Sequence, residues 1–143
     1  MAEHSIAIEE NPRLEDIRLL YSELHKYNVG RTNLPGDLID VFLRDSDNEV
    51  LGGAHGWTGW NWLHVDALWL REDARHKGYG TRIMLATEAE ALRRGCRHAE
   101  LETFSFQARG FYEKLGYRVF AELDDFADVH KWYFLKKDLL DPQ

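Results

Sequence analysis

The chain has 143 residues, of which 44% are hydrophobic and 30% are charged, and its net charge at pH 7 is −7. This length suits a single domain with one core, and the composition is that of a globular protein rather than a disordered one. A chain this acidic is not expected to bind nucleic acid or an anionic membrane over its whole surface. We therefore expect one domain over residues 1–143, with neither of these partners.

The cysteine content and the apolar runs predict the compartment. Cys96 is the only cysteine, so neither an internal disulfide bond nor a cysteine-based zinc cluster is expected. Residues 1–13 are acidic and hold no apolar run, so we expect no signal peptide. The longest uncharged stretch, 50–65, is too short and too rich in Gly, His and Asn to span a bilayer. These features predict a cytoplasmic protein.

The first predicted element is an amphipathic helix that starts at Asn11 and Pro12, because Asn is a favoured N-cap and Pro a favoured first helical residue. Apolar residues then recur at helical spacing on one face; they are Leu14, Ile17, Leu20, Tyr21 and Leu24. The pattern stops near Gly30, and residues 33–36 are predicted to form a connecting loop. Whether a strand precedes this helix stays open at this point.

Three strands are predicted next. Residues 38–44 are β-rich and residues 45–48 form a turn cluster, so a second strand from Val50 completes a hairpin. Four glycines in this second strand indicate bulges or close backbone contacts. The third strand covers residues 61–70. Strict alternation places these residues on one of its faces: Trp62, His64, Asp66, Leu68 and Leu70.

The remaining elements complete an α/β (α+β) domain. We expect helices at 79–94 and 106–115 and strands at 98–104, 117–123 and 131–137. The unit from strand 61–70 through helix 79–94 to strand 98–104 should be a parallel, right-handed β-α-β crossover. The predicted fold is a mixed, mostly antiparallel central sheet flanked by helices, with this β-α-β unit as its core.

A basic stretch suggests a local anionic ligand. Residues 71–97 hold seven basic and four acidic side chains, a net charge of +3, which leaves −10 on the rest of the chain. Within this stretch, Gly78 and Gly80 stand between the third strand and the next helix, where backbone N–H groups can hold a phosphate. The loop is not a Walker A motif, because the pattern GxxxxGK[ST] is missing, and it is not a Rossmann fingerprint, because position 83 is Ile rather than the third glycine. Taken alone, this loop is better explained as a plain turn.

Two motifs together resemble a known family. The first is Arg75-x-x-Gly78-x-Gly80, and the second runs from Ser105 through Ala108, Phe111-Tyr112 and Gly116-Tyr117. They resemble the coenzyme motif and the downstream segment of the GNAT superfamily of acetyl-CoA-dependent N-acetyltransferases. The resemblance covers residues 61–120. It departs from the family at Ser105, where Asn is frequent, and at His76, where many members have Gly.

The resemblance implies acetyl-CoA as the co-substrate and a sheet whose fourth and fifth strands splay apart to admit it. The pantetheine arm would follow the backbone of Leu68 and Leu70 like an added strand, and the pyrophosphate would lie on the amides of residues 76–81. The implied coenzyme-binding residues are Leu68, Leu70, Arg75, His76, Lys77, Gly78, Tyr79, Gly80, Thr81, Ser105 and Phe111.

Three residues are candidates for the chemistry. The resemblance implies that Tyr112 protonates the leaving thiolate. Asp66 and His64 lie on the predicted strand face that should point to the site, so either could act as the base, and Asp66 could instead anchor a cationic substrate. Each could also serve only in packing or local hydrogen bonding. Glu100 and Glu102 are weaker candidates, because strand register is uncertain from sequence.

These expectations describe an N-acetyltransferase that moves the acetyl group of acetyl-CoA directly to a primary amine in a ternary complex. The acidic remainder of the chain favours a small cationic metabolite, a drug or a lysine-like acceptor. The alternative is a non-catalytic acyl-CoA-binding regulatory or interaction module with the same fold. We predict no metal, because the histidines lack ligand spacing, and a homodimer is possible. The sequence does not identify the acceptor.

Overall fold

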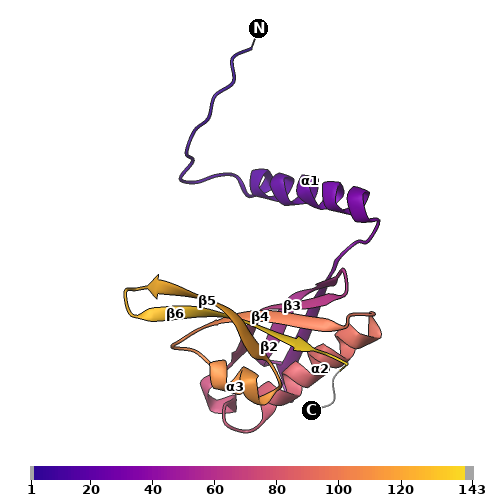
Figure 1. The fold of residues 1–143 in the computed structure, drawn as a ribbon, viewed down its shortest axis with the longest axis vertical. Helices are drawn as coiled ribbons and strands as arrows, with labels where there is room; N and C mark the ends of the chain where they lie inside the picture. Colours follow the sequence, from indigo (N-terminus) through magenta and orange to yellow (C-terminus); the bar gives the residue numbers. More distant parts are fainter. Residues whose placement is uncertain (1, 141–143) are drawn as a thin grey trace. The chain divides into compact units, whose positions relative to one another are not determined.

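The computed structural model describes residues 2–140, and the chain divides into two compact units, Met1–Pro35 and Gly36–Gln143 (Figure 1). The first unit holds helix α1, Leu14–Thr32. Its N-cap is Arg13 rather than the predicted Asn11, and its C-cap is Asn33, whose backbone is left-handed. Residues 2–13 form no strand, and no residue of α1 is buried.

The second unit is built on a six-stranded sheet in the order β1-β2-β3-β4-β6-β5. The β3–β4 pair is parallel and the other pairs are antiparallel, so the predicted mostly antiparallel sheet and its parallel crossover are confirmed. The strands are β1 Asp37–Arg44, β2 Val50–Gly59, β3 Trp62–Leu70, β4 His98–Phe104, β5 Arg118–Phe126 and β6 His130–Asp138.

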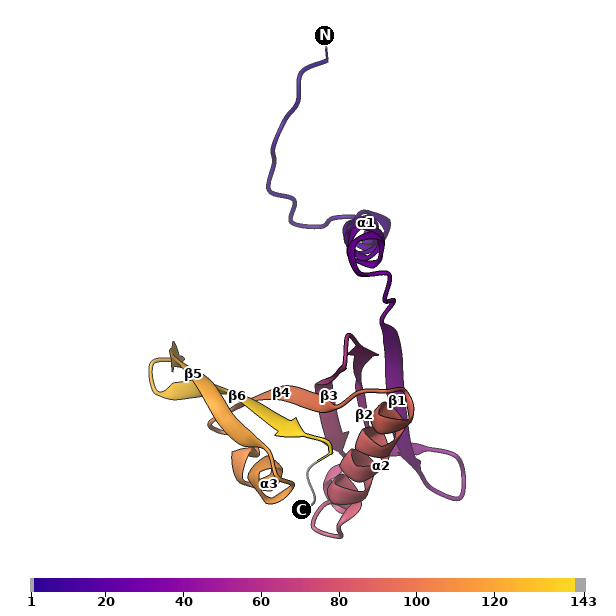
Figure 2. The same cartoon turned by 45° about the vertical axis from the view of Figure 1, so that its right-hand side comes forward.

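Two helices lie on one face of this sheet (Figure 2). Helix α2, Tyr79–Arg93, matches the predicted 79–94. Helix α3 spans only Arg109–Lys114 instead of 106–115. It starts late because the chain first turns after β4, where the N–H of Gln107 donates to the carbonyl oxygen of Phe104 at 2.9 Å.

The core lies between the sheet and these helices. Alternate residues of the central strands point into it, among them Leu63, Val65, Leu101 and Leu135, and Met84 of α2 packs against them with no exposed surface. Burial of such side chains is the main favourable term in folding. The sheet and α2 therefore form the rigid frame that positions the loops and side chains described below.

A β-bulge in β3 changes which residues share a face. His55 of β2 pairs with Ala67 while Gly56 pairs with Val65, so Asp66 is the extra residue. Beyond this bulge the alternation shifts by one, and Leu68 packs against the core on the helix side. The prediction that Leu68 and Leu70 share a face with His64 and Asp66 is therefore wrong, because strict alternation assumes an unbroken ladder.

Candidate active site

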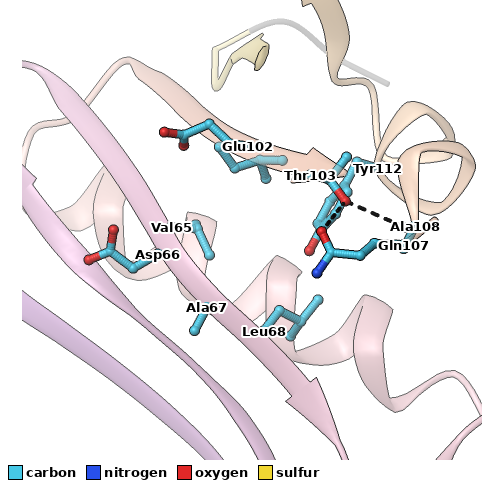
Figure 3. A pocket seen from close by; sticks show the side chains of 10 residues that line it. Val65, Asp66, Ala67, Leu68, Glu102, Thr103, Gln107, Ala108 and Tyr112 are labelled. Atoms are coloured by element: carbon cyan, nitrogen blue, oxygen red, sulfur yellow. Dashed lines mark hydrogen bonds between the residues drawn. The ribbon is translucent and has the colours of Figure 1, made fainter. Parts of the chain in front are cut away.

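The candidate site lies where β3 and β4 separate. Their parallel pairing runs only from Trp62 and His98 to Val65 and Leu101, although both strands continue beyond these residues. Figure 3 shows the two strands diverging around a cavity of about 250 Å³. Side chains from both strands and from the segment that leads into α3 line it; they include Asp66, Leu68, Glu102, Thr103, Gln107 and Tyr112.

The splayed strands were expected as the fourth and fifth and are found as β3 and β4, because residues 2–13 form no strand. The backbone of Leu68 and Leu70 lies beyond the last pair that β3 makes with β4. On its other side, this stretch of β3 pairs with β2, at Ala54 and Gly52. The arrangement leaves one edge of β3 facing the gap.

The loop between β3 and α2 has the geometry of an anion cradle. Arg75 closes it onto the end of β3, since its Nε donates to the carbonyl oxygen of Leu70 at 2.9 Å. His76 and Gly78 both have positive φ, +62° and +83°, and α2 begins directly after Gly78. The first N–H groups of a helix have no partner within the helix and carry its positive dipole end. The amides of residues 78–81 are thus available to an anion.

Gly80 is favoured by a close contact rather than by its backbone angles. A Cβ atom at this position would lie 3.3 Å from the ring of Phe111 and 3.6 Å from Leu70. Phe111 of α3 therefore packs directly on the first turn of α2. This contact brings together three of the predicted coenzyme residues: Gly80, Phe111 and Leu70.

Tyr112 reaches the same cavity from α3. Its side chain is only 8% exposed, and burial raises the pKa of its phenol above the ordinary value. In Figure 3, Tyr112 and Gln107 lie toward the right of the cavity, whereas Asp66 of β3 and Glu102 of β4 lie toward its left. A phenol and two carboxylates thus line one cavity.

A second cavity of about 250 Å³ adjoins the first and shares Asp66, Glu102 and Gln107 with it. Its other lining residues are His64, Phe104 and Trp132. The lining includes two carboxylates, Asp66 and Glu102, and two aromatic rings, Phe104 and Trp132. Such a lining favours a cation, because carboxylates and aromatic ring faces both attract positive charge.

His64 lies at the centre of a carboxylate cluster, which we define as His64, Asp66, Glu100 and Glu102. Its Nδ1 lies 3.0 Å from Glu100 Oε2, and its Nε2 lies 2.8 Å from Asp66 Oδ1 and 3.8 Å from Glu102 Oε2. The hydrogen bond to Glu100, with the three negative charges, raises the pKa of His64 to about 9. His64 is therefore an imidazolium at pH 7, with both ring N–H groups facing carboxylates.

Glu102 has the opposite character within this cluster. Burial and the neighbouring charge of Glu100 raise the pKa of its carboxyl to about 7. A group with this pKa can both accept and release a proton near neutral pH. Glu102 was a weak candidate from sequence because its face was uncertain, and the pairing of Glu102 with Phe134 of β6 places it.

The same cluster contains donor types that a divalent cation uses. Ligand atoms of His64, Glu100 and Glu102 lie within 4.8 Å of one another. Ligation needs a neutral imidazole, however, and the carboxylates around His64 favour its protonated form. The absence of a metal stays a prediction.

Ser105 lies apart from the cavities described above. Its Oγ accepts from the N–H of Lys131 at 3.0 Å and lies 3.2 Å from His130 Nδ1, so it ties the end of β4 to β6. Gln107, two residues later, does line both cavities, and its Oε1 accepts from the N–H of Phe104 at 2.7 Å. Sequence reasoning missed Gln107, because it occupies an unspecified position of the second motif.

No helix within residues 2–140 is long and apolar enough to cross a membrane. Among the tryptophans, Trp57 packs on His64, Trp62 packs on His98, and Trp69 is exposed. Trp132 lines the second cavity.

Comparison with known proteins agrees with this geometry. The Acetyltransferase (GNAT) family pattern matches residues 7–117. The blasticidin-S acetyltransferase of Streptomyces morookaense is 41% identical over 106 residues, which cover 73% of this chain and 78% of that protein. Among solved structures, a protein from Agrobacterium tumefaciens described as an acetyltransferase has a TM-score of 0.87 and 26% identity. The match covers 94% of this chain and 99% of that protein's chain.

A second similar structure was solved with acetyl coenzyme A. It is a protein from Bacillus anthracis described as a streptothricin acetyltransferase, with a TM-score of 0.63 and 18% identity. The match covers 71% of this chain and 62% of that protein's chain. At this identity it shows a shared fold. The family match over most of the sequence, together with the 41% identical relative, identifies the function class. The chain belongs to the GNAT family of acetyltransferases.

Proposed function

We propose that this acetyltransferase moves the acetyl group of acetyl-CoA directly to a primary amine of a small cationic molecule, in a ternary complex. The observation that carries the proposal is the gap between β3 and β4, which has Tyr112 on one side and the carboxylates of Asp66 and Glu102 on the other. The first side suits a coenzyme thioester and the second suits an ammonium group. The relative named blasticidin-S acetyltransferase supports a drug-like acceptor.

The coenzyme would be held by backbone and side chains of the residues expected from sequence. Its pyrophosphate would accept hydrogen bonds from the backbone N–H groups of residues 76–81, and Arg75 and Lys77 would add positive charge. Its pantetheine arm would lie along the open edge of β3 at Leu68 and Leu70. The N–H of Leu68 would then polarise the thioester carbonyl, a role that no side-chain substitution removes.

Glu102 is the better candidate for the base, and His64 for a fixed cation. An alkyl ammonium with a pKa near 10.4 is neutral in only about one part in 10³ at pH 7, so transfer needs a proton acceptor. The pKa of His64, about 9, keeps it protonated, whereas Glu102 titrates at about 7. Asp66, on the rim of both cavities, would attract the incoming ammonium.

The proposed step balances with these groups. Glu102 takes the first proton of the ammonium and releases it to solvent, and the neutral amine nitrogen then bonds to the thioester carbon. Its surplus proton passes to Glu102, the carbon–sulfur bond breaks, and the thiolate takes a proton from the phenol of Tyr112. Tyr112 regains a proton from solvent, to which Glu102 releases its own. Because burial raises the pKa of Tyr112, this donation contributes about 10²-fold or less to the rate.

Calorimetric titration with acetyl-CoA tests the proposal. We expect micromolar binding, about −8 kcal/mol, in the wild type. Gly80→Glu should abolish it, because the new side chain meets Phe111 and places a carboxylate beside the pyrophosphate. Gly30→Glu is the matched control, since a Cβ there meets no heavy atom within 4 Å and Gly30 lies on α1. This variant should bind like the wild type.

Thiol release with a panel of amines then tests the acceptor class. We expect CoA release with dicationic amines and little with neutral hydroxylated analogues. Binding of acetyl-CoA without CoA release from any amine would favour the non-catalytic acyl-CoA-binding module. Failure to bind millimolar acetyl-CoA would overturn the proposal. A single domain, a homodimer and a cytoplasmic location stay predictions.

A further inference from the structure

A buried polar network lies behind the candidate site, on the helix side of the sheet. Lys137 Nζ of β6 lies 2.7 Å from Glu88 Oε1 of α2, and both side chains are less than a tenth exposed. Tyr117, which directly precedes β5, donates its Oη–H to Glu88 Oε2 at 2.9 Å. The Lys137 ammonium also lies 5.5 Å from the centroid of the Tyr117 ring. We call Glu88, Lys137 and Tyr117 the buried triad.

A contribution to folding stability is a weak explanation for the buried triad. A buried ion pair gains little over apolar side chains of similar volume, because two charges must leave water. What the triad does provide is a defined orientation of the Tyr117 side chain, because a hydrogen bond to a charged acceptor fixes the donor more tightly than apolar packing does. Its geometry therefore fixes the ring of Tyr117 against α2.

Tyr117 in turn holds Tyr112. The N–H of Tyr117 donates to the carbonyl oxygen of Tyr112 at 3.1 Å, and the N–H of Leu115 donates to the same oxygen at 3.0 Å. The two tyrosine rings pack edge to face, with centroids 6.1 Å apart. The position of the Tyr112 side chain is thus coupled to that of Tyr117 through both backbone and ring.

A second contact completes the attachment of α3 to α2. Phe111 packs on Gly80 at the start of α2, while Tyr117 binds Glu88 two turns further along the same helix. Tyr112 lies between these two attachment points in the sequence. Because α2 also begins at the anion cradle, the spacing between the cradle and the Tyr112 phenol is set by this helix.

We propose that Glu88 is a positioning residue for acetyl transfer: held by Lys137, it anchors Tyr117 and so places the phenol of Tyr112 where the coenzyme sulfur departs. This inference rests on the proposed function, in which Tyr112 protonates the thiolate. The triad lines neither of the two cavities and acts through Tyr112. Its loss should affect turnover rather than coenzyme binding.

The test is a double-mutant cycle on Tyr112 and Tyr117. Tyr117→Phe removes a single hydroxyl and leaves the Glu88–Lys137 pair in place. We expect it to lower kcat about tenfold while the Kd of acetyl-CoA stays within about twofold. In a Tyr112→Phe background, adding Tyr117→Phe should lower kcat by less than about twofold, because the group that it positions is already absent.

Two further variants separate positioning from stability. Leu139→Val removes one methylene from the core and should leave kcat within about twofold even if it lowers the melting temperature. The double variant Glu88→Gln/Lys137→Met removes both charges together, so no charge is left unpaired, and it retains an amide oxygen for Tyr117. It should keep more activity than Tyr117→Phe.

The outcomes distinguish this inference from the function on which it rests. Equal losses of kcat from Tyr117→Phe in both backgrounds, or a large loss of acetyl-CoA affinity, would overturn the positioning role while leaving acetyl transfer intact. A wild-type protein that releases no CoA with any amine would overturn both. Near-complete non-additivity with unchanged coenzyme affinity supports the proposal.

Discussion

His76 carries backbone strain within the cradle. Its φ of +62° lies in the left-handed region, which costs a residue with a Cβ about 1–2 kcal/mol and costs glycine almost nothing. We therefore expect His76→Gly to be more stable than His76→Ala by about 1 kcal/mol, measured as the free energy of unfolding in urea.

Arg75, one residue earlier, provides the control for this comparison. Its φ is −77°, so a Cβ adds no strain there, and glycine only adds disorder to the unfolded chain. Arg75→Gly should therefore be less stable than Arg75→Ala, the opposite order to position 76. The same order at both positions would contradict the assignment of strain to His76.

Glu102 predicts a pH dependence. With a pKa of about 7, its carboxyl is largely protonated at pH 6 and largely ionised at pH 8, and only the ionised form can accept a proton. The kcat/KM for the acceptor should therefore rise through an apparent pKa near 7. Glu102→Gln should lower kcat/KM by about 10²-fold and remove this step.

Glu122→Gln is the matched control for Glu102, because Glu122 is half-exposed on β5 and pairs with Lys131. This variant should keep both the rate and the step near pH 7. If Glu102→Gln retained the same step, the base would have to be another group.

At the scale of strands and helices, most boundaries in residues 36–140 could be predicted, because the apolar periodicity stops where glycines mark turns between the elements. Strand β4 was predicted with the residues that it has, and α2 within one residue. The faces of β3 could not be predicted. The bulge at Asp66 arises from pairing with β2, a long-range contact that leaves no mark in the local alternation.

This bulge also explains why the sequence placed only some of the residues that line the gap. Because Asp66 is the extra residue, Leu68 turns toward the core while Asp66 stays beside His64, which it contacts at 2.8 Å. The gap therefore receives carboxylates from one sheet face and the phenol of Tyr112 from the other. Motif spacing identified Tyr112 and the cradle, whereas the carboxylate cluster depends on the register of β3 with β4.

At the scale of the whole molecule, the two units differ in how well their sequence predicts them. The apolar stripe of α1 correctly predicted a helix, but none of its residues is buried, so helical periodicity alone did not predict burial. The strand left open before this helix does not form in residues 2–13. The apolar periodicity of a helix identifies a face that can be buried, but it does not identify the element that would cover this face.

Charge distribution leads to a prediction that belongs to the whole chain. Outside residues 71–97 the chain carries −10, and this charge includes the carboxylates of Asp66 and Glu102 in the candidate acceptor cavity. A cationic acceptor is therefore attracted over distances that salt screens, since the Debye length falls from about 10 Å at 0.1 M to about 3 Å at 1 M. The KM of a dicationic amine should rise several-fold over this range.

A monocationic amine of similar size is the comparison, measured in the same CoA-release assay at saturating acetyl-CoA. Its KM should rise less, because the attraction scales with the charge of the acceptor. Equal KM changes for both amines would mean that acceptor charge is not recognised. The acidic cavity would then act on the proton transfer alone, through Glu102, and acceptor selection would fall to the aromatic wall of Phe104 and Trp132.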